Sequence, residues 1–362
     1  MSTPIKPAGV ELNTGHKASL ESLPLTIDQP KEPIPEKLIP TVDEPRQAKD
    51  LLATQLSPEA KAPNLDGKYE QVEELGTGGT AKVIKARSTD TGNVVAIKIF
   101  NDWLQPKQST RSFREIRLLQ ELQHPHIVEI VEWGSFDRRL AIVMPFAEGN
   151  LAKEIKTIEP KALVKATLDI LDGLDYLHAR DITHRDLKPE NILRVNGVVQ
   201  IADFGIAKKR SGTFIETDLT SGGFVGTPEF VAPEEARYFL EPLTYPNPSE
   251  QIYADQFDIY GVGAMLFLGL TREFPIDLPQ RSKGDFDIIP GTRIIATKPP
   301  KSLRKLNPKI HEELAGLVMA ILEKDPAKRK QTFTDRKHPE FTSPKVLSHR
   351  LSSLLTRDLI TC

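Results

Sequence analysis

The chain has 362 residues, of which 39% are hydrophobic and 27% charged, and its formal net charge at pH 7 is −2. This balance fits a globular protein with one large domain or two lobes, and it argues against a nucleic-acid binder or a polybasic membrane surface. The single cysteine, Cys362, excludes an internal disulfide, which suits the reducing environment of the cytoplasm. The longest apolar run, 260–270, is too short to cross a bilayer and predicts a buried helix.

Residues 1–66 differ in composition from the rest of the chain. They hold ten of the 29 prolines, and the first fifteen residues lack the apolar core of a secretory signal. Because such a segment buries too little apolar surface to offset its ordering entropy, we expect a disordered tail. The stretch PKEPIPEK, 30–37, favours an extended polyproline-like backbone that serves as a linker or a docking peptide, and 46–56 is compatible with a short helix.

Alternating patterns then predict a small sheet with one helix. The expected strands cover 69–76, 81–88, 94–100, 127–136 and 140–146. Apolar residues at helical spacing predict the helix over 112–123. A sheet-rich lobe is therefore expected before residue 149.

After Gly149 the pattern becomes helical. Helices are expected over 161–180, near 255–271, near 310–323 and over 346–360, and a short strand is expected at 198–200. The leucine spacing of the last helix favours packing on the domain over binding of a partner helix.

Two motifs of the sheet region suggest phosphate chemistry without establishing it. The stretch LGTGGTAKV, 75–83, lets backbone approach a phosphate closely, although glycine-rich hairpins are more often simple turns. Because a strand follows and no Gly-Lys-Ser/Thr sequence ends the stretch, it is neither a dinucleotide fingerprint nor a P-loop. Lys98 in VAIK, 95–98, is either an edge lysine with its head in water or a partner of Glu115 on the following helix.

The stretch ITHRDLKPENIL, 182–193, concentrates charged side chains between apolar residues. Buried charges need partners, so this loop requires a ligand or counter-ions. Asp203 follows the next strand in IADFGIAKK, 201–209, and Asn191 lies five residues after Asp186. Carboxylate and amide oxygens suit Mg²⁺ bound to substrate phosphates, whereas each residue alone is more often a turn residue.

The order of these motifs carries more information than any one of them. A glycine loop, VAIK, a helix glutamate, HRDLKPEN, DFG and APE follow one another between Tyr69 and Phe341. In this order the chain resembles eukaryotic-type serine/threonine protein kinases over about three-quarters of its length. The resemblance implies an α+β, bilobal fold, with a small β-rich N-lobe that has one main helix and a larger α-helical C-lobe. The expected bounds are about 69–144 for the N-lobe, 145–149 for a hinge, 150–341 for the C-lobe and 342–362 for a C-terminal helical extension.

The resemblance also implies roles for individual residues, with ATP and Mg²⁺ as cofactors. Asp186 is expected to orient the substrate hydroxyl and accept its proton, and Lys188 to contact the transferred phosphoryl group. Lys98, held by Glu115, is expected to contact the α- and β-phosphates. The implied metal ligands are Asn191 and Asp203.

The nucleotide is expected between the glycine loop and the hinge. Ala147 would offer its backbone N–H and C=O to adenine, and Pro145 does no harm because the family uses the carbonyl at that position. The residues implied around the nucleotide are Leu75, Gly76, Thr77, Gly78, Gly79, Val83, Ala96, Lys98, Met144, Ala147 and Leu193. Ala81 stands where the family has the third glycine of the loop, and its methyl group would stiffen the loop slightly.

Several positions resemble serine/threonine rather than tyrosine kinases. Lys188 in DLKPEN and Thr227 in GTPEFVAPE are typical of that class. The family pattern further predicts a buried ion pair between Glu234 and Arg329, and a catalytic loop braced by Asp258. The implied partners are proteins that carry Ser or Thr, without nucleic acid and without a membrane span.

The activation segment leaves regulation open. Gly223 stands where many relatives carry the activating phospho-residue, and Thr220 and Ser221 lie just before it. One hypothesis is that these two are autophosphorylated and that the phosphate binds Arg185 and a basic cluster at 208–210. The alternative is a constitutively active enzyme with a flexible loop rich in Gly and Thr.

Two other function classes can be weighed against an active protein kinase. A pseudokinase scaffold usually lacks the equivalent of Lys98, Asp186 or Asp203, and all three are present. A small-molecule kinase of related fold generally lacks the GTPEF–APE segment that docks peptides. The expected function is therefore transfer of the ATP γ-phosphoryl group to Ser or Thr hydroxyls of proteins.

Overall fold

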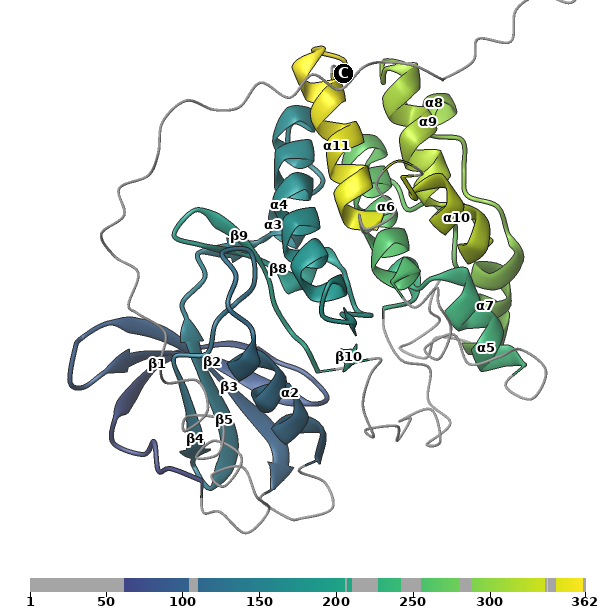
Figure 1. Cartoon of the computed structure of the whole chain (residues 1–362). Helices are drawn as coiled ribbons and strands as arrows, with labels where there is room; N and C mark the ends of the chain where they lie inside the picture. Colours follow the sequence, from purple (N-terminus) through teal and green to yellow (C-terminus); the bar gives the residue numbers. More distant parts are fainter. Residues whose placement is uncertain are drawn as a thin grey trace, which may run out of the picture. The chain divides into compact units, whose positions relative to one another are not determined.

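The computed structural model describes residues 62–103, 110–205, 207–209, 227–241, 255–279, 288–335, 337 and 343–360. Within them a small lobe of strands with one main helix precedes a larger lobe of helices, so the predicted α+β bilobal fold is confirmed (Figure 1). The predicted polyproline-like stretch 30–37, the helix at 46–56 and the residues Thr220, Ser221 and Gly223 lie outside the described residues.

The small lobe is built around one antiparallel sheet with the spatial order β1-β2-β3-β5-β4. Its strands are β1 (Tyr69–Thr77), β2 (Ala81–Ser88), β3 (Val94–Trp103), β4 (Glu132–Phe136) and β5 (Arg139–Pro145). The register pairs Val83 with Lys98 and Ala96 with Met144. Paired residues on neighbouring strands point to the same face of a sheet, and so do residues two positions apart on one strand. These four side chains therefore lie on one face of the sheet. The strand register thus gathers four predicted nucleotide-site residues.

The opposite face of the sheet carries its own apolar core, and Leu65 is part of it. This leucine precedes the first strand, yet it is fully buried among the isoleucines and valines of that face. The Leu65 N–H donates to the Ser135 carbonyl at 2.9 Å, and the Ser135 N–H donates to the Pro63 carbonyl at 2.7 Å. Residues 63–66 therefore belong to the small lobe, which corrects the predicted end of the tail at residue 66.

Two truncations should locate this boundary in solution. Removal of residues 1–61 should leave the free energy of unfolding of the domain unchanged, because their composition supports no apolar core. Removal of residues 1–66 should lower it by about 2–4 kcal/mol, since a buried leucine side chain and its neighbouring backbone hydrogen bonds are lost. Denaturant unfolding of both truncated chains measures the difference, and equal midpoints would contradict the boundary.

Helix α2 (Thr110–Glu121) packs on the face of the sheet that carries Lys98, and it buries Ile116 and Leu119. The predicted strand over 127–136 is shorter than expected, because β4 begins only at Glu132. The Val128 N–H instead donates to the Ile201 carbonyl of the large lobe at 2.9 Å. The segment before β4 thus satisfies its backbone groups by joining the two lobes.

The large lobe surrounds helix α6 (Gln256–Thr271), in which every residue up to Leu270 is buried. A helix that is apolar all round belongs in the centre of a fold, as predicted for the run at 260–270. The other helices are α3 (Leu151–Glu154), α4 (Pro160–His178), α5 (Pro233–Leu240), α7 (Ile288–Thr297), α8 (Leu303–Leu306), α9 (Glu312–Ile321), α10 (Pro326–Thr332) and α11 (Ser343–Thr356).

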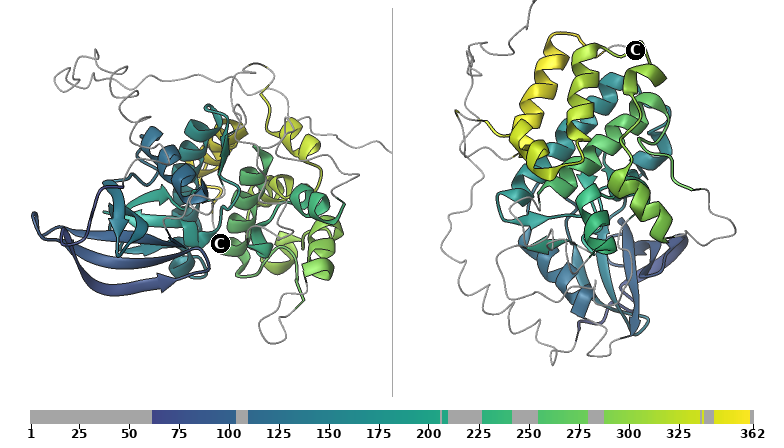
Figure 2. Two further views of the ribbon diagram at one scale, coloured as in Figure 1. Left: turned by 90° about the horizontal axis from the view of Figure 1, so that it is seen from below. Right: turned by 90° about the vertical axis from the view of Figure 1, so that its right-hand side faces the viewer.

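The C-terminal helix α11 lies along α4, with which Figures 1 and 2 show it side by side. It buries Leu347 and Leu351 completely, so the prediction that it packs on the domain is confirmed. None of the described helices combines the length and the apolar character that a membrane crossing requires.

Short strands place the two loops that carry the charged motifs. One small sheet contains β6 (Gly149–Asn150), β8 (Ile192–Val195) and β9 (Val198–Ile201), and β7 (Ile182–Thr183) pairs with β10 (Lys208–Lys209). The HRDLKPEN stretch runs from β7 to β8, and Asp203 follows β9 with only Ala202 between them. Because β8 pairs with β9, the two loops emerge side by side under the small lobe.

Candidate active site

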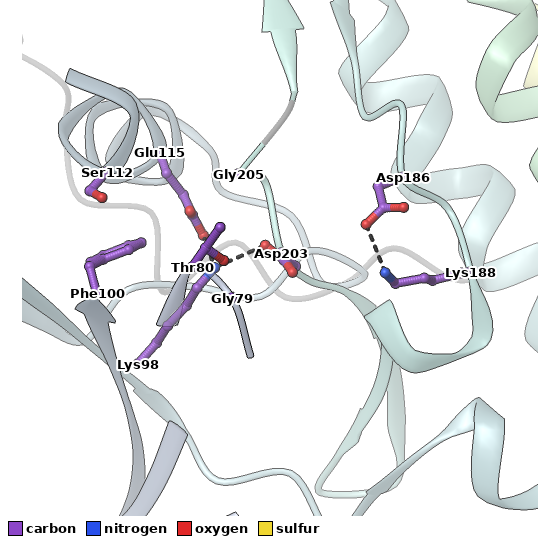
Figure 3. Close-up of a pocket in the computed structure, with 10 residues that line it drawn as sticks. All are labelled: Gly79, Thr80, Lys98, Phe100, Ser112, Glu115, Asp186, Lys188, Asp203 and Gly205. Carbon is purple, nitrogen blue, oxygen red and sulfur yellow. Dashed lines mark hydrogen bonds and ion pairs between the residues drawn. The ribbon is translucent and has the colours of Figure 1, made fainter. Parts of the chain in front are cut away.

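Two adjoining cavities lie between the glycine loop and the HRDLKPEN loop. The first, of about 300 Å³, is mainly polar and is lined by Gly79, Thr80, Lys98, Phe100, Ser112, Glu115, Asp186, Lys188, Asp203 and Gly205. Figure 3 shows Lys98, Glu115 and Asp203 gathered at one side of it, and Asp186 facing Lys188 at the other. Five charged side chains from four different segments thus converge on one space, as a ligand with several negative oxygens would need.

Lys98 is held between two carboxylates. Its Nζ lies 2.6 Å from Glu115 Oε1 and 2.9 Å from Asp203 Oδ1, so the expected contact with Glu115 is present. Burial acts to lower the pKa of Lys98, but Glu115 and Asp203 outweigh it and raise that pKa. Burial likewise acts to raise the pKa of Asp203, and Lys98 outweighs it, so the pKa is lowered. Lys98 and Asp203 therefore stay charged at neutral pH, and the contacts of Lys98 with both carboxylates hold the three side chains in place.

Asp186 faces the cavity from the opposite side and is fixed by its own loop. Lys188 Nζ lies 3.0 Å from Asp186 Oδ2 and also donates to the Thr227 hydroxyl at 2.8 Å. The Asn191 side-chain amide donates to Asp186 Oδ2 at 3.1 Å and to the Asp186 carbonyl at 2.8 Å. Thr227 and Lys188, both typical of the serine/threonine class, thus meet beside Asp186, and one carboxylate oxygen of Asp186 is held by two donors.

The HRDLKPEN loop is braced from below by Asp258, as predicted. Asp258 Oδ2 accepts from the His184 N–H at 2.9 Å, and Oδ1 accepts from the Arg185 N–H at 2.8 Å. Asp258 Oδ2 also lies 2.8 Å from His178 Nε2. Burial acts to raise the pKa of Asp258, but the hydrogen bonds and charge from the histidines outweigh it and lower the pKa. A buried carboxylate thus ties down the backbone that carries Asp186.

The second predicted brace, the ion pair of Glu234 with Arg329, is also present. Arg329 Nη2 donates to Glu234 Oε1, and both side chains are buried, at 0% and 1% exposed. This pair links α5, which begins at Pro233 of the APE motif, to α10 of the large lobe. The helix that carries the end of the activation segment is thereby anchored to the core.

Loss of this anchor should be costly. Arg329→Met leaves Glu234 buried without its cation and should lower the free energy of unfolding by about 3–5 kcal/mol. The matched control is Arg357→Met, which removes an exposed ion pair with Glu313 and should hardly change the unfolding midpoint. Denaturant unfolding measures both, and equal effects of the two substitutions would contradict the structural role of the buried pair.

The second cavity, of about 330 Å³, is mainly apolar and holds most of the residues expected around adenine. It is lined by Leu75, Val83, Ala96, Lys98, Glu115, Leu119, Val128, Met144, Pro145, Ala147, Gly149, Asn150, Lys153, Glu190, Asn191, Leu193, Ala202 and Asp203. An apolar slot that opens onto a charged pocket suits a flat heterocycle that carries phosphates. Of the expected set, Gly76, Thr77 and Gly78 line neither cavity.

The glycine loop leaves space above the charged pocket. A Cβ added at Gly76 or Gly79 would meet no protein atom within 4 Å, and neither residue has a positive φ. Neither internal packing nor backbone conformation therefore requires glycine at these positions. The remaining physical reason for glycine at positions 76 and 79 is that a phosphate can then approach the loop backbone closely.

Asn101 on β3 ties this loop down, and the sequence patterns gave no sign of it. Its side-chain amide donates to the Gly78 carbonyl at 3.0 Å and to the Gly79 carbonyl at 3.1 Å. The Asn101 N–H also donates to the Thr80 carbonyl at 2.9 Å. The two strands on either side of the loop were predicted. The role of Asn101 was not, because no motif requires an asparagine three residues after Lys98.

Asn101→Leu removes the side-chain donor and nearly preserves the size of the side chain. Because the glycine loop is then less well held, the KM for ATP should rise by about 3–10-fold, and kcat should change less. Asn93→Leu in the exposed turn before β3 is the control and should leave both constants unchanged. Steady-state kinetics at varied ATP decides, and an unchanged KM in Asn101→Leu would rule out the clamp.

The donor set fits a magnesium nucleotide better than a tightly bound protein metal. No group of three or more His, Cys, Asp or Glu side chains among the described residues is placed to hold a metal ion. Asp203 and Asn191 supply only two oxygen-bearing side chains, and the Asp203 side chain is 47% exposed to the cavity. Mg²⁺ retains waters and binds substrate phosphates through one or two protein carboxylates, so this small set is adequate for it.

Comparison with known proteins agrees with this geometry. Residues 69–341 match the family model of the protein kinase domain. The chain is 33% identical over 267 residues to a probable serine/threonine-protein kinase PknB of Lactococcus lactis subsp. lactis. The matched residues cover 71% of this chain and 39% of that protein. It is 30% identical over 278 residues to the serine/threonine-protein kinase PrkC of Bacillus subtilis. This match covers 75% of this chain and 40% of that protein.

A further relative is the serine/threonine-protein kinase cds1 of Schizosaccharomyces pombe, 32% identical over 305 residues that cover 78% of this chain and 60% of that protein. The chain thus spans about two-fifths of the length of the two bacterial relatives and three-fifths of the third. Since the kinase-domain match extends over most of the chain, the chain belongs to the protein kinase family.

Proposed function

We propose that this chain is a serine/threonine protein kinase that transfers the γ-phosphoryl group of ATP to Ser or Thr hydroxyls of proteins. The observation that carries the proposal is the charged pocket, with Lys98 between Glu115 and Asp203 on one side and Asp186 with Lys188 on the other (Figure 3). Phosphoryl transfer asks mainly for positioning and for electrostatic stabilisation, and this pocket offers both.

Asp186 is the proposed base. Asn191 and Lys188 hold one of its oxygens, so the carboxylate keeps one orientation toward the cavity. As the substrate oxygen bonds to the γ-phosphorus, its proton passes to Asp186, and the bond from that phosphorus to the bridging oxygen breaks, which releases ADP. Lys188 faces the same space and would balance negative charge on the transferred group.

Lys98 is proposed to position the α- and β-phosphates, because two carboxylates fix its ammonium group at the floor of the cavity. Asn191 and Asp203 would hold Mg²⁺, which would neutralise phosphate charge when bound. The adenine is proposed in the apolar cavity, against Val83, Leu193 and the hinge at Ala147. The order of the two cavities, apolar then charged, supports this orientation of the nucleotide.

The preference for Ser and Thr rests on Lys188 and Thr227 and on the names of the relatives. The Lys188 ammonium donates to the Thr227 hydroxyl beside Asp186, which narrows the space at the proposed base. A Ser or Thr hydroxyl of a bound protein substrate is proposed to reach this point. Protein substrates are therefore the proposed partners.

Incubation of the purified chain with Mg·ATP and a generic protein substrate tests the proposal. Mass spectrometry should find phosphate on Ser and Thr of the substrate, and also on the chain itself, where Thr220 and Ser221 are the expected sites. Nucleotide binding without any transfer would favour a pseudokinase scaffold, and transfer only to tyrosine would contradict the proposed class. Asp186→Asn protein is the negative control.

A further inference from the structure

Arg185, which directly precedes Asp186, has a carboxylate partner within the fold. Its Nη2 donates to Glu235 Oε1 at 2.5 Å, and the two side chains are only 12% and 8% exposed. Glu235 lies on α5, 50 positions further along the chain, next to the Glu234 that binds Arg329. The arginine expected to bind a regulatory phosphate is thus paired with a buried glutamate.

Arg185 is also fixed at its backbone. Its φ is +72°, which is unfavourable for a residue with a Cβ, and its N–H donates to Asp258 at 2.8 Å. Its guanidinium lies 5.7 Å from the centre of the Phe257 ring. With its backbone held by α6 and its side chain held by α5, Arg185 sets the course of the chain into Asp186.

The surrounding charges make the pair hard to separate. If Arg185 turned to another anion, Glu235 would be left buried beside Glu234, whose own cation is Arg329. Burial raises the pKa of Glu235, and Arg185 is the main group that opposes this. An unpaired charge at such a site is strongly unfavourable, so the glutamate favours retention of its partner.

We propose that Glu235 is the permanent counter-ion of Arg185 and a positioning residue for Asp186, so that phosphoryl transfer does not require a phosphate on the activation segment. The proposal rests on the proposed kinase function. It selects the constitutively active enzyme over the switch hypothesis, in which Arg185 binds a phosphate on Thr220 or Ser221. Autophosphorylation there remains compatible with it, but it is not needed for turnover.

The first arm of the test removes every Ser and Thr acceptor from residues 210–226 of the activation segment, and Thr227 is kept because its hydroxyl contacts Lys188. A full-length variant replaces the five Ser and Thr residues of 210–226 by alanine, namely Ser211, Thr213, Thr217, Thr220 and Ser221. Mass spectrometry confirms that the segment carries no phosphate. Its kcat on an added protein substrate should stay within about twofold of the phosphorylated wild-type chain, and a loss of about tenfold or more would overturn the proposal.

The second arm removes the charge of Glu235 at constant shape. Glu235→Gln should lower kcat by about tenfold or more while the KM for ATP changes by less than about threefold, because Asp186 is displaced and the nucleotide cavities are not. Glu235→Asp, which restores the carboxylate, should recover part of the rate, whereas loss of packing alone would not favour Asp over Gln. Wild-type kcat in folded Glu235→Gln protein would overturn the proposal.

A buried arginine without its partner can prevent folding, so the double variant Arg185→Met, Glu235→Gln is measured as well. It removes both charges and should unfold thermally like the wild type, yet its kcat should remain at least about tenfold low. Wild-type turnover in this folded double variant would overturn the proposal. An inactive wild-type chain in both phosphorylation states would overturn the kinase function and this inference together, whereas inactivity of only the phosphate-free form would overturn this inference alone.

Discussion

Replacement of Asp186 by asparagine should lower the turnover of phosphoryl transfer by about 10²–10⁴-fold, the usual contribution of a positioned base, while nucleotide affinity stays nearly unchanged. Asparagine keeps the size of the side chain and can still accept a hydrogen bond from Lys188. It cannot take the proton of the substrate hydroxyl at neutral pH. The loss should therefore appear in kcat rather than in the binding of ATP.

Asp186 lines only the charged cavity, and the apolar cavity proposed for adenine does not include it. This separation makes the prediction specific. Single-turnover kinetics with saturating Mg·ATP gives the rate, and direct titration with a fluorescent nucleotide gives the affinity. Retention of more than about a tenth of the wild-type turnover would remove Asp186 from the role of base.

The contacts that the sequence predicted correctly share one physical feature. Each joins a buried charged group to a partner that it cannot do without, as in Lys98 with Glu115 and Glu234 with Arg329. Such pairs limit the number of compatible folds, and the order of motifs then indicates which groups meet. The long central helix was predicted for a related reason, since its apolar run at 260–270 must be covered on all sides.

The features that the sequence did not reveal depend on single residues without a repeating pattern. Leu65 is one leucine in a proline-rich region, and it joins the core through backbone hydrogen bonds with Ser135 and through packing against the sheet. Helix α7 contains Pro290 and Gly291 in its first turn, and a Pro-Gly pair in a sequence more often indicates a turn than a helix. Tertiary contacts override both signals.

Glu235 shows the same limit inside the site. Its neighbour Glu234 belongs to a recognisable motif, and the partner of that residue was predicted correctly. Glu235 matches no motif, and nothing in its local sequence indicates that it meets Arg185 across 50 residues. The consequence is large, because this one contact changes the expected role of Arg185 from a phosphate receptor to half of a built-in ion pair.

Lys98→Met should lower the single-turnover rate of phosphoryl transfer by about 10²-fold and weaken ATP binding by less than about 10-fold. The rate should suffer more because the lysine positions phosphates rather than adenine. Methionine nearly preserves the shape of the lysine stem. It leaves Glu115 buried and Asp203 partly buried without the cation that now offsets their burial. The pKa of Asp203 should consequently rise, since Lys98 is the main group that lowers it.

Loss of the Lys98 charge should also change the pH dependence of nucleotide binding. In the wild type, Asp203 is ionised across the neutral range because its pKa is lowered, so metal-dependent nucleotide binding should not depend on its titration there. In Lys98→Met, Asp203 should become protonated at a higher pH than in the wild type, and Mg-dependent binding of ATP should weaken earlier as the pH falls. Lys68→Met, which removes an exposed ion pair with Glu132, is the control and should change neither quantity. An unchanged rate together with lost affinity would show that Lys98 binds the nucleotide without positioning it.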